Sequence, residues 1–559
     1  MKHPKKDPYR PPDDAVWYLA LGGAGEIGMN LSLYGTAGKW LMVDCGVTFG
    51  DETTPGVEII MPDISFLTER RDDLIGLVVT HGHEDHIGAI EHLWPQFQCP
   101  VYATKFTAEL IRRKIDRADL KNKVRLIELP KGGDFEIGPF KGSMIPVTHS
   151  IPESNMLSIT TKHGTVLHTG DWKFDPEPLV GDLTDEASLK KLGSEGVMAL
   201  VGDSTNALVA GHSGSERLVL DEFKNLFGTI KQRIVVTCFA SNIARLKSIA
   251  AAAKQHKRYV TLVGRSLWRN AEVAEDCGYL PEFEDFLTED EAMHAPRDKI
   301  VMVCTGCQGE ARAALWRIAM EDHPEVELSA GDTVIFSSRD IPGNEKQIAR
   351  LQNRLIAQGL KVITQDHAPV HVSGHPAQDE LTQLFQWTRP NLLLPVHGEA
   401  RHQMEHVRIA KECQVPHALI PANGQIIRLG PGIHEVVAEV PSGRVGLDGK
   451  VLRRIDHEAN KHRKKMSTQG AAVITLVMDQ RGKITHDPQI SLMGLIDDEH
   501  MESLQGDIAA SVQDAVEAMP KSTRLDDAAV RHRAAQAARR LLQEVHGKKP
   551  VMEVHVVRI

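Results

Sequence analysis

The sequence is poor in three features that would each point to a class of protein: long apolar runs, paired cysteines and excess positive charge. No apolar run approaches the roughly 18 residues of a membrane span, and the proline-rich start "MKHPKKDPYRPPDDAVW" lacks the apolar stretch of a signal peptide. Seven scattered cysteines fit a reducing compartment, so we expect a cytoplasmic protein with no membrane partner. The formal net charge of -10 gives no overall positive field that would attract nucleic acid. Binding of a polyanion would therefore need local positive patches or a metal.

A single C-x-x-C pair, Cys304 and Cys307 in "VMVCTGCQGE", raises the question of a zinc ribbon. Such a ribbon would need a second pair, and the sequence has none. We expect these cysteines to be buried small residues at the end of a strand. A redox pair is the alternative.

The stretch "LGGAGEIGMN" (21–30) matches the G-x-G-x-x-G pattern of dinucleotide-binding turns, with Gly23, Gly25, Gly28 and the acidic Asp44 about twenty positions on. A dinucleotide site requires a helix directly after the glycines. Instead, "NLSLYGTAGKWLMVDCG" alternates apolar and polar residues and predicts strands joined by a turn. We therefore expect the glycines to close an edge hairpin, near the loops described next, and not to bind a nucleotide.

Histidine is abundant, with 27 residues, and the strongest signal is "LIGLVVTHGHEDHIGAIEHL". Residues 74–80 predict a buried strand, a loop follows, and "IGAIEHLWPQF" begins a helix. In the loop, His81, His83, Asp85 and His86 place four metal-binding side chains within six positions. One short loop can therefore contribute to two adjacent metal sites.

Three further ligand-type residues follow apolar strands elsewhere in the chain. His149 follows the strand in "GSMIPVTHSIPES", Asp171 lies in "GTVLHTGDWKFD", and His397 follows the strand in "NLLLPVHGEARH". Strand ends gather at the edge of a sheet, so we expect these side chains to join the histidine loop at one site.

These residues resemble the metallo-β-lactamase superfamily, whose fold is an αββα sandwich. Asp44, in "LMVDCG", matches the acidic residue that supports the ligands from behind. The resemblance implies two zinc ions per chain, and manganese would also fit histidine and carboxylate ligands. It implies that one ion is held by His81, His83 and His149, the other by Asp85, His86 and His397, and that Asp171 bridges the two.

The interval between Asp171 and His397 is too long for a compact small-molecule hydrolase of this fold. Residues 216–375 alternate helix and strand, which predicts a parallel α/β layer. Seven motifs in this half of the chain resemble the β-CASP nucleases, among them the bacterial ribonuclease J family. They are "GDSTNA", "FASNIAR", "VGRSLWRN", "TGCQGE", "RDIPGNE", "HVSGHP" and "PVHGEARH". Cys307 and the N-terminal "MKHPKKDPYRPP" depart from the family pattern.

The resemblance implies an α/β fold: a metallo-β-lactamase sandwich, an inserted β-CASP α/β domain and a small α+β C-terminal domain. In that C-terminal domain, "AAVITLVMD" and "VMEVHVVRI" predict strands, and 502–519 and 524–546 predict helices. By resemblance this domain supports a homodimer or homotetramer. The expected boundaries are 1–215 and 376–450 for the sandwich, 216–375 for the β-CASP domain, 451–470 for a linker and 471–559 for the C-terminal domain.

The same resemblance implies a metal-dependent ribonuclease that acts in RNA maturation and decay. It would be a 5′-to-3′ exonuclease that prefers single-stranded RNA with a 5′-monophosphate, and it would also cut internally. A hydroxide between the two metals is the expected nucleophile, since metals lower the pKa of bound water to about 7. The catalytic candidates are Asp85, His375 as donor of the leaving-group proton, and Asp203, which follows the strand "MALVGD" and can orient a histidine.

RNA contacts are expected in two places. Ser241, Arg339, His371 and Ser373 are candidates to line a 5′-phosphate pocket, and Arg265 is a candidate for the RNA backbone; a structural role is the alternative for each. In the linker, four cationic residues either contact RNA or form a solvated charge run: Lys461, Arg463, Lys464 and Lys465.

Three other functions stay open at this point. The first is a DNA nuclease of the same branch, which only the family resemblance argues against. The second is a lactamase or lactonase, which the domain-sized insert disfavours. The third is a non-catalytic RNA-binding or scaffolding protein, which would be expected to have lost ligands, whereas all seven expected ligands are present.

Overall fold

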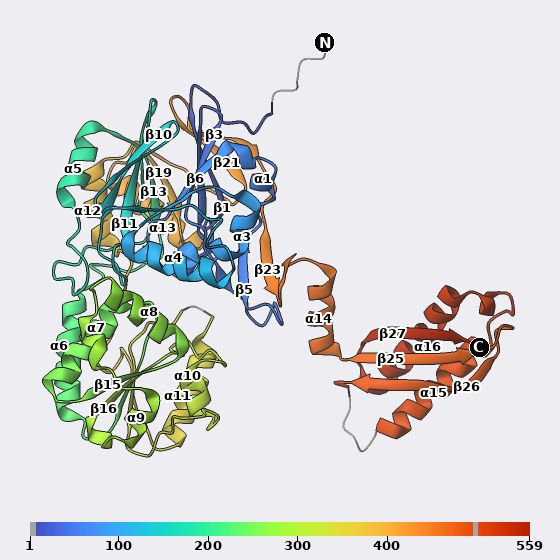
Figure 1. Cartoon of the computed structure of the whole chain (residues 1–559). Coiled ribbons are helices and arrows are strands. Elements are labelled where there is room, and N and C mark those ends of the chain that lie inside the picture. Colours follow the sequence, from blue (N-terminus) through green and yellow to red (C-terminus); the bar gives the residue numbers. More distant parts are fainter. Residues whose placement is uncertain (1–6, 342, 496–500) are drawn as a thin grey trace, which may run out of the picture. The chain divides into compact units, whose positions relative to one another are not determined.

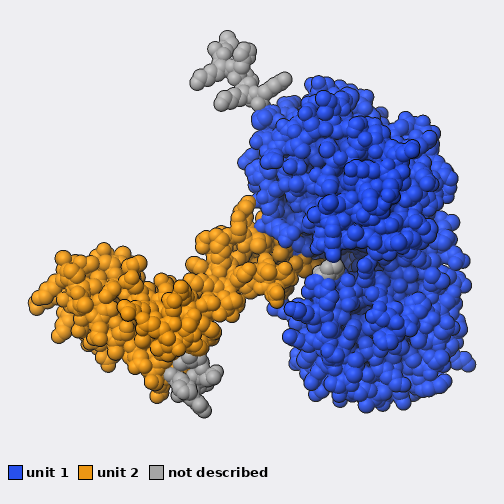
Figure 2. Space-filling view, turned by 180° about the vertical axis from the view of Figure 1, so that it is seen from behind, with its two compact units in different colours: residues 1–48, 61–444 blue, residues 49–60, 445–559 orange. Residues whose placement is uncertain are grey.

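The computed structural model describes residues 7–341, 343–495 and 501–559. The first six residues of the proline-rich N-terminus, position 342 in "RDIPGNE" and residues 496–500 of the expected C-terminal domain lie outside the described residues. The chain forms two compact units, one of residues 1–48 and 61–444 and one of residues 49–60 and 445–559 (Figure 2). Among the helices of the described ranges, none is both long and apolar enough to cross a membrane.

Two sheets pack face to face in the first unit. Their shared core contains Tyr18 and Val78 from one sheet and Leu157 and Leu394 from the other, all fully buried. The first sheet has the order β22 (Glu435–Glu439), β21 (Gln425–Gly430), β1 (Val16–Gly22), β2 (Leu31–Thr36), β3 (Lys39–Val43), β6 (Leu74–Val78), β7 (Val101–Thr104), β8 (Leu126–Leu129). The second has the order β20 (His417–Ala418), β19 (Leu392–Val396), β13 (Val197–Asp203), β12 (Gly164–His168), β11 (Asn155–Thr161), β10 (Phe140–Pro146), β9 (Asp134–Ile137).

Helices cover the outer faces of both sheets, which completes the predicted αββα sandwich (Figure 1). On the second sheet, Leu189, Leu384 and Ile409 of three helices pack against Leu200 and Leu393 of its strands. These helices are α5 (Glu186–Glu195), α12 (Gln378–Thr388) and α13 (Ala400–Glu412). The helices next to the first sheet are α1 (Ser65–Thr68), α3 (Ile90–Phe97) and α4 (Lys105–Arg117).

The glycine turn joins β1 to β2, as predicted, but the hairpin lies inside the first sheet. The expectation of an edge hairpin was wrong because β21 pairs with β1 on its other side. At Gly23, φ is +83°, and a Cβ there would lie 2.5 Å from the Asn30 side-chain oxygen, so glycine is required. The Gly23 carbonyl accepts a hydrogen bond from the His397 amide (2.7 Å), and the Asn30 amide donates to the Asp85 carbonyl (3.0 Å). The turn therefore supports two of the ligand loops.

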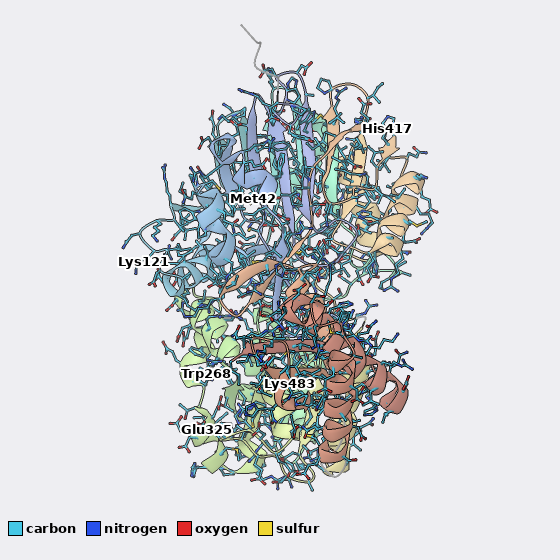
Figure 3. All side chains as sticks on the ribbon, turned by 90° about the vertical axis from the view of Figure 1, so that its right-hand side faces the viewer. Met42, Lys121, Trp268, Glu325, His417 and Lys483 are labelled. Carbon is cyan, nitrogen blue, oxygen red and sulfur yellow. The ribbon has the colours of Figure 1, made fainter. Side chains whose placement is uncertain are left out.

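The segment inserted between β13 and β19 forms its own parallel sheet, as its sequence pattern predicts. Trp268 lies in this domain and Met42 in the sandwich (Figure 3). Cys304 and Cys307 are buried at the end of one of its strands, as predicted. The strand order is β15 (Tyr259–Val263), β16 (Ile300–Cys304), β14 (Ile234–Thr237), β17 (Thr333–Phe336), β18 (Lys361–Ile363). The helices around it are α6 (Glu216–Thr229), α7 (Ile243–Gln255), α8 (Arg265–Asp276), α9 (Glu289–His294), α10 (Ala314–Ala319) and α11 (Glu345–Ala357).

The second unit contains the small α+β domain, with two helices packed on a three-stranded sheet. Its elements are β25 (Ala471–Met478), β26 (Ile484–Met493), α15 (Met501–Glu517), α16 (Asp527–His546) and β27 (Val551–Arg558). The sequence analysis did not include β26, whose side chains are mostly exposed.

The segment expected as a linker, 451–470, has regular structure. It forms a strand and α14 (Glu458–Gln469), and the Arg463 side chain binds the Asp448 carboxylate (2.7 Å) and the Pro55 carbonyl (3.2 Å). The strand belongs to a four-stranded sheet with the order β24 (Val451–Arg454), β23 (Arg444–Asp448), β5 (Ile59–Pro62), β4 (Thr48–Phe49).

Candidate metal centre and active site

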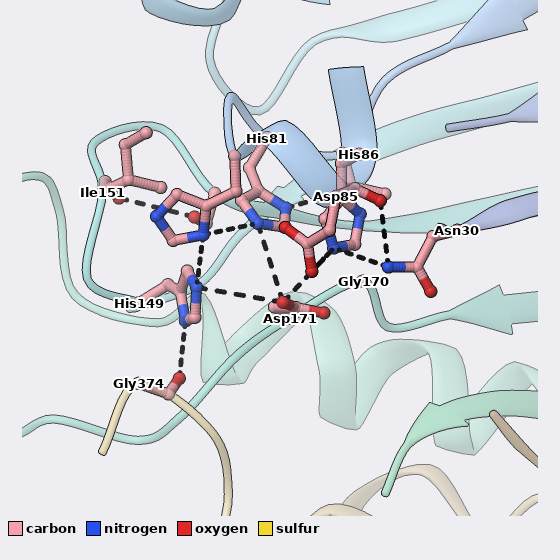
Figure 4. Close-up of polar contacts among 12 residues, drawn as sticks. Asn30, His81, Asp85, His86, His149, Ile151, Gly170, Asp171 and Gly374 are labelled. Atoms are coloured by element: carbon pink, nitrogen blue, oxygen red, sulfur yellow. Dashed lines mark hydrogen bonds and ion pairs between the residues drawn. The ribbon is translucent and has the colours of Figure 1, made fainter. Parts of the chain in front are cut away.

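The H-x-H-x-D-H segment is half loop and half helix. His81 and His83 lie in the extended chain after β6, whereas Asp85 and His86 belong to the one-turn helix α2 (Glu84–Ile87). Because the backbone changes direction here, the side chains of the first two residues and those of the last two lie in two adjacent clusters (Figure 4). The segment was expected to be a loop throughout, and its second half is helical.

The first cluster contains His81, His83, His149 and Asp171, which each offer one ligand atom within 4.8 Å of the others. His83 Nδ1 lies 3.2 Å from His81 Nε2 and 3.1 Å from His149 Nε2. Asp171 Oδ2 is 3.8 Å from the His81 ring nitrogen and 4.0 Å from that of His149. The structure thus brings together the four residues that the sequence analysis grouped.

The second cluster contains Asp85, His86, His397 and again Asp171. His397 Nε2 lies 3.0 Å from Asp85 Oδ2, and His86 Nε2 lies 3.2 Å from Asp171 Oδ2. Because the same Asp171 oxygen faces both clusters, its position between them is that of a bridging ligand.

Hydrogen bonds made by the outer ring nitrogens orient two of the histidines toward the clusters. His149 Nδ1 donates to the Gly374 carbonyl (2.6 Å), so its Nε2 lone pair faces inward. The Thr205 hydroxyl donates to the His397 carbonyl (2.8 Å) and therefore accepts from His397 Nδ1 (2.5 Å), which frees His397 Nε2. Such outward bonds fix the tautomer of a histidine that binds metal.

The electrostatics of the two clusters differ. Burial lowers the pKa of His81, His83 (to about 4) and His149, so these imidazoles are neutral and their lone pairs repel one another at this spacing. At His86, burial also opposes the charge, but the Asp171 and Asp85 carboxylates outweigh it and raise the pKa. Converging nitrogen lone pairs and a buried carboxylate form a donor set that fits zinc or a similar divalent ion.

Asp44 lies behind the histidine loop, at the position expected for a supporting residue. Its Oδ2 accepts from His86 Nδ1 (2.7 Å) and from the Thr80 hydroxyl (2.9 Å), and its Oδ1 accepts from the Thr80 amide (2.8 Å). The Thr80 hydroxyl in turn accepts from His81 Nδ1 (3.0 Å). One carboxylate therefore orients a histidine in each cluster.

His375 and Asp203 form a pair beside the clusters. His375 Nδ1 donates to Asp203 Oδ2 (2.8 Å) and lies 3.9 Å from Asp171 Oδ2. Burial lowers the pKa of His375, but Asp203 and Asp171 outweigh it and raise the pKa overall. The Asp203 side chain is fully buried, whereas 22% of the His375 side chain is exposed. His375 is therefore an accessible imidazole whose protonated form is favoured by two neighbouring carboxylates, as suits a general acid.

The sequence matches four family models that together span most of the chain. They are the Metallo-beta-lactamase superfamily (25–228), Ribonuclease J, beta-CASP domain (231–355), Zn-dependent metallo-hydrolase RNA specificity domain (359–417) and Ribonuclease J C-terminal domain (461–559). It is 43% identical to Ribonuclease J of Sinorhizobium meliloti over 98% of both chains. The chain belongs to the ribonuclease J family. This family membership makes it a metal-dependent ribonuclease, which argues against a lactamase, a lactonase or a non-catalytic scaffold.

Other relatives of this ribonuclease span most of its length as well. Ribonuclease J of Thermus thermophilus is 36% identical over 83% of this chain and 82% of its own, and that of Mycolicibacterium smegmatis is 35% identical over 97% of both. A crystal structure of a protein of unknown function from Enterococcus faecalis V583 shares the fold, with a TM-score of 0.52 and 16% identity over 74% of this chain and all of that one.

Only some of the candidate RNA-binding residues of this ribonuclease form hydrogen bonds with residues at or near the metal-ligand clusters. Ser373 Oγ accepts from the His375 amide (3.1 Å), and His371 Nδ1 lies 3.5 Å from the Arg245 guanidinium. Within the described residues, no side-chain hydrogen bond joins Ser241 or the exposed Arg265 to this group. In α14, two of the four cationic candidates are engaged in ion pairs, Lys461 with Glu458 and Arg463 with Asp448.

Sequence reasoning missed several residues that orient this centre. Asn30 donates to the Asp85 carbonyl (3.1 Å) and contacts His86 Nε2 (3.1 Å), Thr205 orients His397, and Asn206 accepts from Arg339 (2.8 Å). The last two lie in "GDSTNA", so the motif itself was the available signal.

Proposed function

We propose that this ribonuclease degrades single-stranded RNA in the 5′-to-3′ direction from 5′-monophosphate ends, cuts RNA internally as well, and acts in RNA maturation and decay. The observation that supports a two-metal mechanism is the pair of clusters that share Asp171. His81, His83 and His149 would hold one zinc ion and Asp85, His86 and His397 the other, with manganese as an alternative metal. When bound, the ions would activate a water molecule and offset the negative charge of the transition state.

The chain's own groups would handle the protons. His375 Nδ1 is committed to Asp203, so its Nε2 would give a proton to the leaving oxygen, and Asp203 would hold the ring in place. Asp85 has a more open carboxylate than Asp171, with 29% of its side chain exposed against 3%, and would orient the attacking water.

A pocket for the terminal phosphate would explain a preference for 5′-monophosphate. Arg339, His371, Ser373 and Ser241 are the candidates to form it, and Arg265 is the candidate for the backbone. A fixed phosphate would set the distance from the RNA end to the bond that is cut.

The test is digestion of an RNA labelled at its 3′ end and carrying either a 5′-monophosphate or a 5′-triphosphate, with metal analysis of the same preparation. Preferential shortening of the monophosphate substrate, with zinc or manganese bound, is expected. Equal rates on both substrates would refute the phosphate pocket.

The state of assembly is also a proposal. We infer a cytoplasmic homodimer or homotetramer, supported by free thiols at all seven cysteines and by exposed apolar residues on the outer strands of the C-terminal sheet, Met493 of β26 and Val557 of β27. Sedimentation of the full chain beside a Val557→Lys variant would test it, and a monomer for both would refute it.

A further inference from the structure

The turn directly after β13 contacts three functional groups at once. Counted from Asp203, the last residue of β13, the first position binds His375 through Asp203 and the third binds His397 through Thr205. The fourth position, Asn206, binds the Arg339 side chain, which lies after β17 in the inserted domain. The turn therefore connects a ligand, the general-acid candidate and an arginine of the other domain.

Asn206 uses both ends of its amide in these contacts. Its Oδ1 accepts from Arg339 Nη1 (2.8 Å), and its Nδ2 donates to the His375 carbonyl (3.4 Å). The residue is only 3% exposed, whereas Arg339 is exposed and forms no other side-chain hydrogen bond within the described parts of the chain. One buried amide thus fixes one edge of a guanidinium and leaves its other N–H groups accessible.

Arg339 differs from the nearby Arg245 in the charge of the side chain that binds it. Arg245 is fully buried and forms an ion pair with Glu216 (3.0 Å), whose carboxylate cancels its charge. Arg339 is held by an uncharged amide instead, so its full positive charge stays available to an anion. An arginine that is oriented but not neutralised suits recognition of a phosphate.

We propose that Asn206 is a positioning residue that holds Arg339 at a fixed distance from His375, and so couples recognition of the 5′-phosphate to the cutting site. This inference rests on the proposed function, because it takes Arg339 as a phosphate ligand. A carboxylate at this position would keep the shape and the bond from Arg339, would lose the weak bond to the His375 carbonyl (3.4 Å), and would offset the charge of Arg339. A methyl group, as in Asn206→Ala, would remove the hydrogen bond that holds the Arg339 guanidinium.

The experiment compares Asn206→Ala, Asn206→Asp, Arg339→Ala and the Asn206→Ala/Arg339→Ala double variant. The substrates are one RNA sequence with a 5′-monophosphate or a 5′-hydroxyl, and the readout is the ratio of their kcat/KM values. Asn460→Ala is the matched control, because Asn460 is also buried and donates to two backbone carbonyls, Arg454 and Ile455, but contacts none of these groups. Thermal unfolding checks that each variant folds.

We expect Asn206→Ala to lower the ratio about tenfold through KM, and the double variant to lose no more than Arg339→Ala alone. Asn206→Asp should lower the ratio although its fold is unchanged, which a purely structural role would not produce. An unchanged ratio in both Asn206 variants, with a loss in Arg339→Ala, would overturn this inference alone. An unchanged ratio in Arg339→Ala would remove Arg339 from the phosphate pocket and overturn this inference, whereas a parent protein that does not distinguish the two substrates would overturn the pocket itself.

Discussion

His375 Nδ1 lies 2.8 Å from Asp203 Oδ2, although 172 positions of the chain separate the two residues. The carboxylate comes from the end of a sandwich strand, and the imidazole comes from the segment that returns from the inserted domain. The pair therefore joins two segments that lie on either side of the inserted domain in the sequence. His375 is outside the two proposed ligand sets, but it forms a third group of possible ligands with Asp171, Asp203 and His397, so metal analysis of a His375 variant tests whether its role is separate from metal binding.

The first prediction tests whether His375 acts in proton transfer without holding a metal. His375→Ala should lower the rate of RNA cleavage by about 100- to 10,000-fold, the usual contribution of a general acid, while the metal content stays unchanged. Single-turnover cleavage and elemental analysis of the same preparation measure both quantities. The exposed His417 provides a control, since His417→Ala should alter neither. Loss of metal from His375→Ala would contradict the assignment.

The second prediction concerns the shared carboxylate. Asp171→Ala should remove both metal ions, because Asp171 Oδ2 faces both clusters, whereas His149→Ala should weaken only the first site. Metal content after dialysis against a weak chelator distinguishes the two variants. Equal loss of metal from the Asp171→Ala and His149→Ala variants would show that the two sites do not fill independently.

The third prediction concerns the residue behind the ligands. Asp44→Asn should weaken metal affinity about 10- to 100-fold, since it removes the charge and replaces one of the two acceptor oxygens that bind His86 and Thr80 with a donor. Asp44 has φ of +61°, which asparagine tolerates, so the backbone should not change. Competition with a chromogenic chelator measures the affinity, and the exposed Asp116→Asn is the control. Unchanged affinity would exclude Asp44 as a supporting residue.

The fourth prediction concerns pH and the buried ion pair of Lys173 with Asp175 (3.3 Å, both side chains 1% exposed). Burial raises the pKa of Asp175, but Lys173 and hydrogen bonds from Ser215 and neighbouring amides outweigh it and lower the pKa overall. A depressed pKa in the folded state stabilises the fold above the unfolded value of 3.8 and loses that effect as the pH falls through the folded value.

Asp175→Asn should therefore destabilise the first unit by about 3 kcal/mol at neutral pH, because it leaves Lys173 buried without a counter-charge. The difference in the free energy of unfolding between this variant and the parent protein should become smaller as the pH falls. Thermal unfolding followed from pH 7 downward measures it, and the exposed pair variant Asp116→Asn should change stability by less than about 1 kcal/mol. A difference that is constant with pH would contradict the ion-pair explanation.

The sequence was most informative where chemistry is concentrated in a few positions. Four ligand-type residues in six positions after an apolar strand indicated the centre, and the family resemblance supplied the domain arrangement. Local periodicity could not show that β21, far along the chain, would pair with β1 and place the glycine hairpin inside the sheet. It also could not reveal α14 or β26, which have few buried side chains. The roles of Thr205 and Asn206 depend entirely on contacts with distant residues.

The order of the ligands along the chain has a consequence for synthesis. His81 to Asp171 are made early, but the second cluster needs His397, which follows the entire inserted domain. A nascent or prematurely terminated chain that ends before His397 therefore contains the histidine loop without a complete second cluster. Under the proposed two-metal mechanism, such a chain would lack part of the residues that activate water and would not cleave RNA.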